Sequence, residues 1–327
     1  MLQYLVILLD DTSVSFCHYS NPIKERRLMP LDILKKGILW AMKENLMIQF
    51  VFPDYTLPNK YLDVIETIDH SKIKPVEQYS NADVIVVQSW EDLDKISFKD
   101  ISVVLRTTKD DLFRNYERII PVLKGITRLN IVFTDIYKFS EADFDTYSAI
   151  LERLAEQVKA LYINDRTVQL NILTDRMMLD KMNNCNAGWE SVTLAPDAKF
   201  YVCPAFYLGN DGYAIGDLQK GLDIKNPQLY RIDHAPICKR CDAYQCRRCV
   251  WLNRKMTLEI NTPSHEQCVI SHLERNASQQ LLTSIRLAGD FLVGREISTL
   301  NYLDPFDNIK ELSLIHISEP TRQEAIS

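Results

Sequence analysis

Cysteines dominate the part of this sequence that could do chemistry. Eight cysteines occur among 327 residues, and all but Cys17 lie in the second half of the chain. Four of them stand in the motif CKRCDAYQCRRC, as the pairs Cys238/Cys241 and Cys246/Cys249, with two residues inside each pair. Two thiolates at this spacing can turn toward one metal centre, which is why the spacing recurs in zinc and iron–sulfur sites. We therefore expect metal binding here.

Seven clustered cysteines exceed the four that close one tetrahedral zinc site, so they indicate two metal centres. The expected ligands are Cys185, Cys203, Cys238, Cys241, Cys246, Cys249 and Cys268. Zinc ribbons usually place about a dozen or more residues between their two pairs, whereas only four separate Cys241 from Cys246. This tight spacing favours iron–sulfur clusters, with structural zinc as the alternative. Buried reduced cysteines are a plainer interpretation, but four thiols in one short motif argue against it.

The composition is that of an ordinary globular chain, with 46% hydrophobic and 25% charged residues. A formal net charge of −6 gives no argument for nucleic-acid binding. The N-terminal MLQYLVILLDD has no basic region, and two aspartates end its apolar run, so it predicts a buried strand and not an export signal. No apolar stretch approaches the ~18 to 20 residues that span a bilayer. We expect a cytoplasmic protein with no membrane or nucleic-acid partner, in a compartment where disulfides are rare.

The first 180 residues alternate strand and helix patterns that would position the cysteines. Strands are expected at 4–9, 47–52, 83–88, 101–106, 128–136 and 168–173. Helices are expected at 30–46, 59–68, 109–126 (interrupted by Pro121) and 140–163, the last opening on a Ser-x-x-Asp capping box. Six such units are too few for an eightfold barrel. They suit either an open barrel or a doubly wound parallel sheet.

After Asp180 the composition of the sequence changes. The alternation in SVTLAPDAKFYVC predicts a hairpin that turns at Pro196-Asp197, and a helix is expected from about His265. We divide the chain into residues 1–180, a cysteine-rich domain at 181–290 and a C-terminal extension at 291–312. The last segment, SLIHISEPTRQEAIS at 313–327, looks like the translation of a sequencing adapter and is excluded from fold reasoning.

The order of the seven cysteines resembles the SPASM domain, the C-terminal extension of many radical S-adenosylmethionine enzymes that modify peptides. The family pattern is C-x(9–15)-G-x4-C, then C-x2-C-x5-C-x3-C, then C, and it binds two auxiliary [4Fe–4S] clusters. The stretch APDAKFYVCPAF, followed by IGDL, is also similar to the family. Two departures occur here: the later gaps inside the quartet are each one residue shorter, and Ala198 stands at the family glycine.

This resemblance implies a division of the ligands. One cluster would be held by Cys238, Cys241, Cys246 and Cys268, and the other by Cys185, Cys203 and Cys249. No cysteine lies a few residues upstream of Cys185, so the second cluster would lack a fourth protein cysteine. Its open iron could bind a substrate thiolate.

More narrowly, the chain to about residue 290 resembles the CXXX repeat peptide maturases, which are radical SAM/SPASM-like proteins. The similar stretches are LLDDTSVSFCHY, LTDRMMLDKMNNC and HAPICKRCDAYQCRRCVWLNRKMTLEINTPSHEQC. The resemblance implies an α/β fold, a partial (β/α)6 barrel of radical SAM type followed by a small cysteine-rich SPASM-like domain. It also implies a part in maturing a cysteine-rich, ribosomally made peptide. The partners would be that precursor peptide and an active radical SAM enzyme or another modification protein.

The N-terminal half departs from the radical SAM pattern in two places. That pattern holds its catalytic cluster with C-x3-C-x2-C, whereas SVSFCHYS has Ser13 and Ser20 at the outer positions and only Cys17 between them. Serine hydroxyls are poor, hard ligands for a soft cluster. The family's G-G-E-P after the second strand is replaced by PDYTLP. We therefore expect a former metal loop, against chance similarity as the alternative, and no S-adenosylmethionine cleavage there.

Three interpretations of function remain open at this point. The first is an iron–sulfur protein that takes part in peptide maturation, with the barrel half as a degenerate scaffold. The second is a zinc-stabilised scaffold that binds peptide or an active enzyme. In the third, the chain is itself an enzyme that works at the open iron of the cluster on Cys185, Cys203 and Cys249.

Overall fold

The computed structural model describes residues 2–96, 101–164, 166–178, 185–209, 212–241 and 246–297. The expected domain junction at residue 180, most of the C-terminal extension and the adapter-like segment lie outside these ranges. Among the described residues, no helix is both long enough and apolar enough to cross a membrane.

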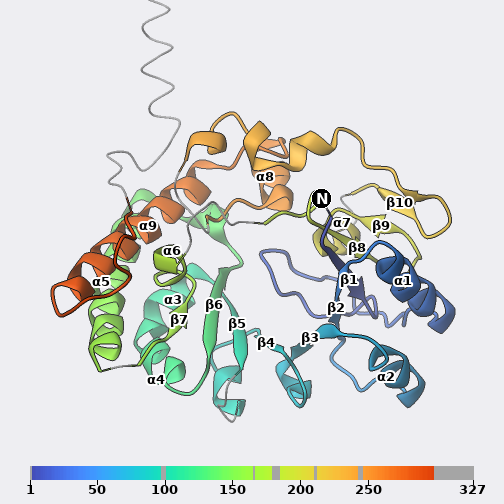
Figure 1. Ribbon diagram of the computed structural model, residues 1–327, viewed down its shortest axis with the longest axis horizontal. Helices are drawn as coiled ribbons and strands as arrows, with labels where there is room; N and C mark the ends of the chain where they lie inside the picture. The colour runs from blue at the N-terminus through green and yellow to red at the C-terminus, as the bar shows by residue number, and fades with distance from the viewer. Residues whose placement is uncertain are drawn as a thin grey trace, which may run out of the picture.

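A nine-stranded sheet forms the centre of the molecule (Figure 1). Its strands are β1 Tyr4–Leu8, β2 Met47–Val51, β3 His70–Pro75, β4 Val84–Val87, β5 Ser102–Thr107, β6 Arg128–Phe133, β7 Gln169–Leu170, β8 Ser191–Leu194 and β9 Phe200–Tyr201. Strands β1 to β7 follow in chain order and pair in parallel, and β8 pairs in parallel with the free side of β1. A doubly wound sheet would reverse its order partway, so the order observed is that of an open barrel.

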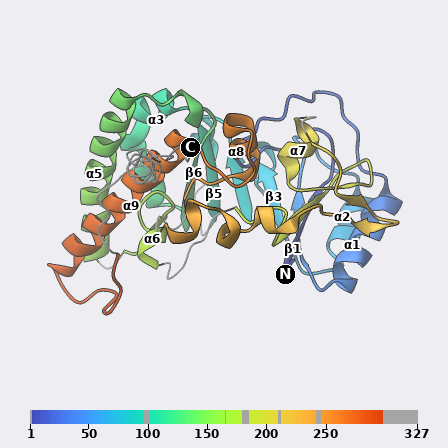
Figure 2. The same ribbon diagram turned by 90° about the horizontal axis from the view of Figure 1, so that it is seen from above.

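Helices connect these strands and cover the outside of the sheet. They are α1 Leu31–Lys43, α2 Asn59–Ile65, α3 Lys109–Asn115, α4 Ile119–Leu123, α5 Glu141–Ile163 and α6 Asp175–Met178. The cysteine-rich part adds α7 Pro204–Leu208, α8 Val250–Thr257, α9 His265–Arg286 and a small hairpin of β10 Gly216–Asp217 and β11 Gly221–Leu222. Figures 1 and 2 show this part, coloured yellow to red-orange, running from α7 beside β9 across to α9 beside α5.

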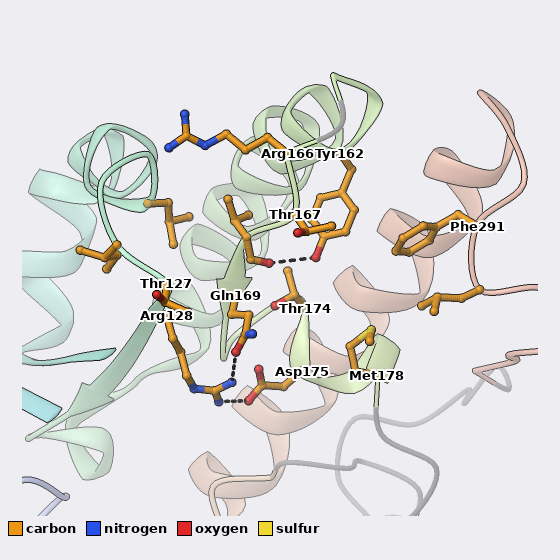
Figure 3. A pocket seen from close by; sticks show the side chains of 14 residues that line it. Thr127, Arg128, Tyr162, Arg166, Thr167, Gln169, Thr174, Asp175, Met178 and Phe291 are labelled. Atoms are coloured by element: carbon orange, nitrogen blue, oxygen red, sulfur yellow. Dashed lines mark hydrogen bonds and ion pairs between the residues drawn. The ribbon is translucent and has the colours of Figure 1, made fainter. Parts of the chain in front are cut away.

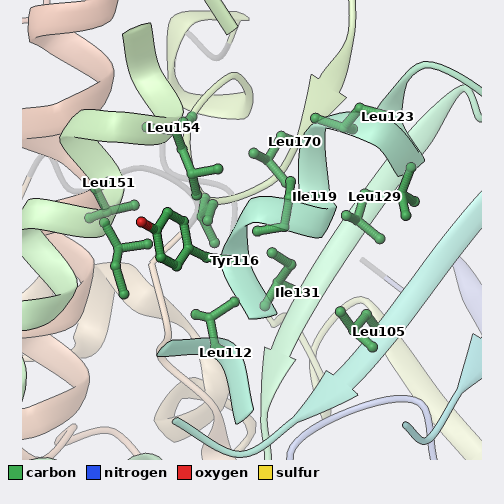
Figure 4. Close-up of a cluster of buried hydrophobic side chains, with 14 of the residues drawn as sticks. Leu105, Leu112, Tyr116, Ile119, Leu123, Leu129, Ile131, Leu151, Leu154 and Leu170 are labelled. Atoms are coloured by element: carbon green, nitrogen blue, oxygen red, sulfur yellow. The ribbon is translucent and has the colours of Figure 1, made fainter. Parts of the chain in front are cut away.

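The outer face of the sheet carries the larger hydrophobic core. Figure 4 shows one part of it, where side chains from β5 and β6 meet those of α3, α4 and α5. Leu105 and Ile131 from the strands and Leu154 from α5 are fully buried, and burying each such side chain contributes about 1.5–3 kcal/mol. This packing fixes the strands that face the cysteines on their other side.

The inner face of the sheet is partly polar and lines a cavity of about 730 Å³. Because side chains alternate along a strand, every second residue of β1, β2, β5, β6 and β8 turns away from the helices and into this lumen. The strand residues that line it are Tyr4, Val6, Gln49, Val104, Asn130, Val132, Ser191 and Thr193. Amides and hydroxyls among them leave the lumen able to hold something other than a hydrophobic core.

One strand differs from the sequence-based expectation. The first half of the chain supplies seven parallel strands, β1 to β7, and not the six expected, because β3, HSKIKP, lies between β2 and β4. Its lysines alternate with the buried Ile73 and Pro75, so the segment lacks an apolar run. The predicted helix at 109–126 does break, into α3 and α4, and the capping box at Ser140 is present.

The hairpin of β8 and β9 turns where the sequence predicted it. The backbone amide of Ala198 donates to the carbonyl oxygen of Ala195 at 3.0 Å, and Ala195 donates to Lys199 at 3.1 Å. Ala198 has a φ of 67°, a left-handed conformation that favours glycine. Glycine is what the SPASM pattern has at this position, so the local backbone agrees with that pattern although the residue does not.

Candidate metal centres

Four of the predicted ligands come together on the outer side of the cysteine-rich part. Cys238, Cys241, Cys246 and Cys268 line one small pocket; we call this set the outer quartet. A single turn at Cys238–Arg240 turns the first two toward the pocket, and the N-terminal turns of α9 carry the last. Burial raises the pKa of Cys238 to about 12. This grouping is the one that the SPASM resemblance implied.

A histidine that sequence reasoning missed joins the outer quartet. His272 is fully buried on α9, and its Nε2 lies 3.5 Å from Sγ of Cys241. Its Nδ1 lies 2.8 Å from the carbonyl oxygen of Cys268, one turn earlier. Because a carbonyl only accepts, Nδ1 must donate there, and a neutral ring then presents Nε2 as an acceptor to the thiol. The available signal was the four-residue spacing between Cys268 and His272 on a predicted helix.

The remaining three predicted ligands line the barrel lumen, and Cys17 is with them. Cys17, Cys185, Cys203 and Cys249 all face the same cavity of about 730 Å³; we call this set the lumen quartet. Cys246 of the outer quartet lines this cavity as well as the outer pocket. A hydrogen bond from the thiol of Cys249 lowers the pKa of Cys185 to about 7. Burial, and then the nearby Cys185, raise the pKa of Cys17 to about 12 and raise that of Cys203. Thiols from four separate segments therefore interact with one another.

The loop 13–20 separates this lumen from a second cavity. Cys17 and its neighbours line the lumen, whereas Ser13 and Ser20 line a cavity of about 610 Å³ on the other side, together with Asp54. The hydroxyl of Ser13 donates to the carbonyl oxygen of Val51 at 2.9 Å and accepts from the amide of Asp10 at 3.1 Å. The three positions of the S-x3-C-x2-S pattern thus do not converge on one point, and they do not suit a cluster held by all three.

A buried arginine lies between the two quartets. Arg248 is 2% exposed and lines both pockets, near the thiols of Cys185 and Cys238. Among the described residues, its Nε, Nη1 and Nη2 have no partner of good hydrogen-bond geometry and no acidic neighbour, and the guanidinium interacts with the thiol of Cys238. A buried charge without a counter-charge is costly. An anionic cluster in either quartet would supply the missing charge, so the residues present suit such a group.

An ion-pair network fixes the cysteine motif to α9. Glu274 is 1% exposed and pairs with Arg247 from the motif and with Arg176, the latter at 2.7 Å. The hydroxyl of Tyr147 also donates to it at 2.8 Å. Nη1 of Arg247 donates to the carbonyl oxygen of Ile131 on β6 at 2.9 Å. The motif is therefore held against both a helix and the barrel wall.

The thiols of both quartets line pockets and do not converge on a single ion. Within the described ranges, no three histidine, cysteine or acidic side chains lie close enough together to share one metal ion. Binding by the seven predicted ligands therefore stays a prediction.

A third cavity carries no cysteine. It has a volume of about 710 Å³ and lies where β6 and β7 begin, beside the end of α5 (Figure 3). Arg128 and Asp175 pair with each other there, and Arg128 also donates to Gln169 at 3.1 Å. Its principal charged groups therefore partner each other.

Comparison with solved structures gives a fold. The chain is similar to anSMEcpe with bound AdoMet and Cp18Cys peptide, with a TM-score of 0.58 and 12% identity over 88% of this chain and all of that one. The complex of anSMEcpe with AdoMet and Kp18Cys peptide gives 0.56 and 12% over 87% and 99%. Streptococcus suis SuiB bound to precursor peptide SuiA is less similar, with 0.41 and 14% over 76% and 68%. No family model and no curated protein sequence matches the chain.

These likenesses rest on shape at low identity. The likeness to anSMEcpe confirms the predicted fold class: an α/β fold with a parallel sheet of radical SAM type and a small C-terminal region with cysteines.

Proposed function

We propose that this is an iron–sulfur protein that takes part in the maturation of a cysteine-rich, CXXX repeat peptide. One [4Fe–4S] cluster would lie on the outer quartet and another in the lumen, on Cys185, Cys203 and Cys249. The observation that carries the proposal is the gathering of thiols at two pockets, with the buried Arg248, which has no acidic partner among the described residues, lining both.

The lumen supports a peptide as the bound partner. The two anSMEcpe structures are described as holding a peptide together with AdoMet, and this chain shares their fold. Gln49 and Asn130 line the lumen, and their side-chain amides can hydrogen-bond a peptide backbone. The precursor peptide would therefore enter beside the lumen thiols.

The loop 13–20 supports a scaffold that has lost S-adenosylmethionine cleavage. Ser13 is committed to two backbone hydrogen bonds, and Ser20 accepts from Arg106 at 3.3 Å. Neither shares a cavity with the thiol of Cys17. An active radical SAM enzyme, or another modification protein, would then supply the chemistry that this loop lacks.

The cluster assignment is tested by anaerobic reconstitution of the full chain with iron and sulfide, followed by iron, acid-labile sulfide and zinc analysis. Cys241→Ala in the outer quartet and Cys203→Ala in the lumen should each remove about half of the iron and sulfide, because each breaks one of two [4Fe–4S] sites. The double variant should remove nearly all of it. A colourless protein that holds stoichiometric zinc and no sulfide would overturn the proposal in favour of a zinc-stabilised scaffold.

The loss of S-adenosylmethionine cleavage has its own test. The reconstituted, reduced protein is incubated with S-adenosylmethionine, and 5′-deoxyadenosine is measured. We expect none above the level of a sample without protein, and enzyme-dependent formation would contradict this part of the proposal. Binding of a synthetic CXXX repeat peptide, measured by fluorescence anisotropy against a serine-substituted copy, tests the partner.

A further inference from the structure

The thiol of Cys17 does not lie where the pattern of its loop predicts. It follows β1, in a loop patterned like a radical SAM cluster loop, yet its thiol faces the lumen with Cys185, Cys203 and Cys249. The thiol of Cys17 lies close enough to those of Cys185 and Cys203 for a charge on one thiol to raise the pKa of its neighbour. The other three are the ligands for which the sequence offered no fourth partner.

The surrounding backbone fixes Cys17 in this place. Nε of Arg106 donates to the carbonyl oxygen of Cys17 at 2.9 Å, and Nη2 of the same side chain donates to that of Tyr19. On the next residue, Nδ1 of His18 lies 2.8 Å from the carbonyl oxygen of Phe133 at the end of β6. The loop is therefore tied to two barrel strands, which directs the half-buried thiol into the lumen.

We propose that Cys17 is the fourth protein ligand of the lumen cluster, an inference that rests on the proposed iron–sulfur function. Four thiolates complete the coordination of a [4Fe–4S] cluster, and each thiol releases its proton on binding. With Cys17 bound, no iron of this cluster is open to a substrate thiolate. The lumen cluster then passes electrons, and the peptide is bound by the lumen walls.

The charges around the lumen suit four thiolates. Arg106 is 5% exposed and spends its donors on the carbonyls of the loop, on Ser20 and on Gln88. Arg248 lies near Cys185 and Cys238 and has no acidic partner among the described residues. Two buried guanidinium groups without a carboxylate partner among the described residues therefore lie near the quartet, Arg106 near Cys17 and Arg248 near Cys185. A cluster with four thiolates is an anion that would balance them.

The test compares wild type, Cys17→Ala and Ser15→Ala, each reconstituted anaerobically as the full chain. Ser15 is the matched control because it lies in the same loop but faces the other cavity, and its hydroxyl has no hydrogen-bond partner among the described residues. Electron paramagnetic resonance is recorded on reduced samples with and without cyanide, a small ligand for an open iron. The outer quartet's cluster is an internal reference in every sample.

We expect the wild-type and Ser15→Ala spectra to stay unchanged when cyanide is added. The lumen signal of Cys17→Ala should shift with cyanide, and mild oxidation of this variant should convert the lumen cluster to a three-iron form, while the reference signal persists. A wild-type lumen signal that shifts with cyanide, or a Cys17→Ala spectrum identical to wild type, would overturn the assignment while leaving two clusters intact. A wild type without iron and sulfide would overturn both this inference and the proposed function. The wild-type measurement decides the question even if Cys17→Ala fails to fold.

Discussion

Nε of Arg106 donates a 2.9 Å hydrogen bond to the carbonyl oxygen of Cys17. The guanidinium is buried, and its other contacts are with Tyr19, Ser20 and Gln88, none of which is acidic. A charged side chain of β5 is thus used to hold a loop that follows β1. The loop would otherwise have buried carbonyl oxygens without donors.

Replacing Arg106 should release this loop. In Arg106→Met the carbonyl oxygens of Cys17 and Tyr19 lose their donors, so the free energy of unfolding should fall by about 2–3 kcal/mol. Denaturant unfolding of the metal-free protein measures this, and mass-resolved maleimide labelling should show faster modification of Cys17. Arg114→Met is the control, because Arg114 makes an exposed i,i+3 pair with Asp111 that is worth about 0–1 kcal/mol. Equal losses of unfolding free energy in the two variants would show that Arg106 does not stabilise the loop.

Ala198 offers a stabilising substitution. Its φ of 67° costs an L-residue roughly 1–2 kcal/mol, and glycine avoids this strain but loses some backbone entropy. Ala198→Gly should therefore raise the free energy of unfolding by about 1 kcal/mol. Ala160→Gly, on the exposed side of α5, should lower it by about 1 kcal/mol. Destabilisation by both changes would argue against a left-handed residue at the hairpin turn.

The hairpin also shows what the sequence could predict. Its turn and the capping box before α5 follow from local sequence patterns, whereas the division of the outer quartet from the other cysteines came from the resemblance to the SPASM domain. Strand β3 could not be predicted from its local sequence. Only Ile73 and Pro75 of its six residues are buried, and the residues that alternate with them are lysines. Its place between β2 and β4 is decided by tertiary packing.

The lumen site was predictable only in part. The resemblance to the SPASM domain grouped Cys185, Cys203 and Cys249, but Cys17 was assigned to a former cluster loop. Which face of that loop each side chain takes depends on Arg106, which is 89 residues away along the chain. No local pattern carries information at that separation. The place of Arg248 between the two pockets could not be predicted either, because its neighbours in the sequence indicate only a basic stretch.

Asp143 gives a pH-dependent prediction at the start of α5. Burial acts to raise its pKa, but hydrogen bonds from Ser140 at 2.7 and 2.8 Å and from Lys109 at 3.0 Å hold the pKa below its usual range. Because the folded pKa is the lower one, the stabilisation is fully present above the unfolded pKa of about 3.9. It is lost as the pH falls through the folded pKa.

Asp143→Asn should accordingly lower the free energy of unfolding by about 1 kcal/mol at pH 7. The difference from wild type should shrink as the pH falls below 4, because both proteins then carry a neutral side chain there. Urea titrations at a series of pH values measure it. Glu152→Gln, exposed on the same helix, should show no comparable difference, and a pH-independent loss in Asp143→Asn would argue against the charge.

Replacing Arg248 should have opposite effects on the metal-free protein and on the protein loaded with clusters. In the metal-free chain its guanidinium is buried beside the thiol of Cys238 and has no acidic partner among the described residues, so Arg248→Met should raise the free energy of unfolding by about 1–3 kcal/mol. In the loaded protein the same change removes the cation between two anionic clusters. Iron release to a chelator should then be faster, and the clusters should be harder to reduce, because net charge helps to set their potentials.

The opposite signs of these effects are what identify the role of Arg248. Lys239→Met is the control, since Lys239 is an exposed cation in the same cysteine motif and its charge is screened by solvent. It should leave both forms nearly unchanged. If Arg248→Met destabilised the metal-free and loaded proteins equally, the arginine would serve packing alone. Opposite shifts in stability and iron retention require an anion beside Arg248 that is present only after loading.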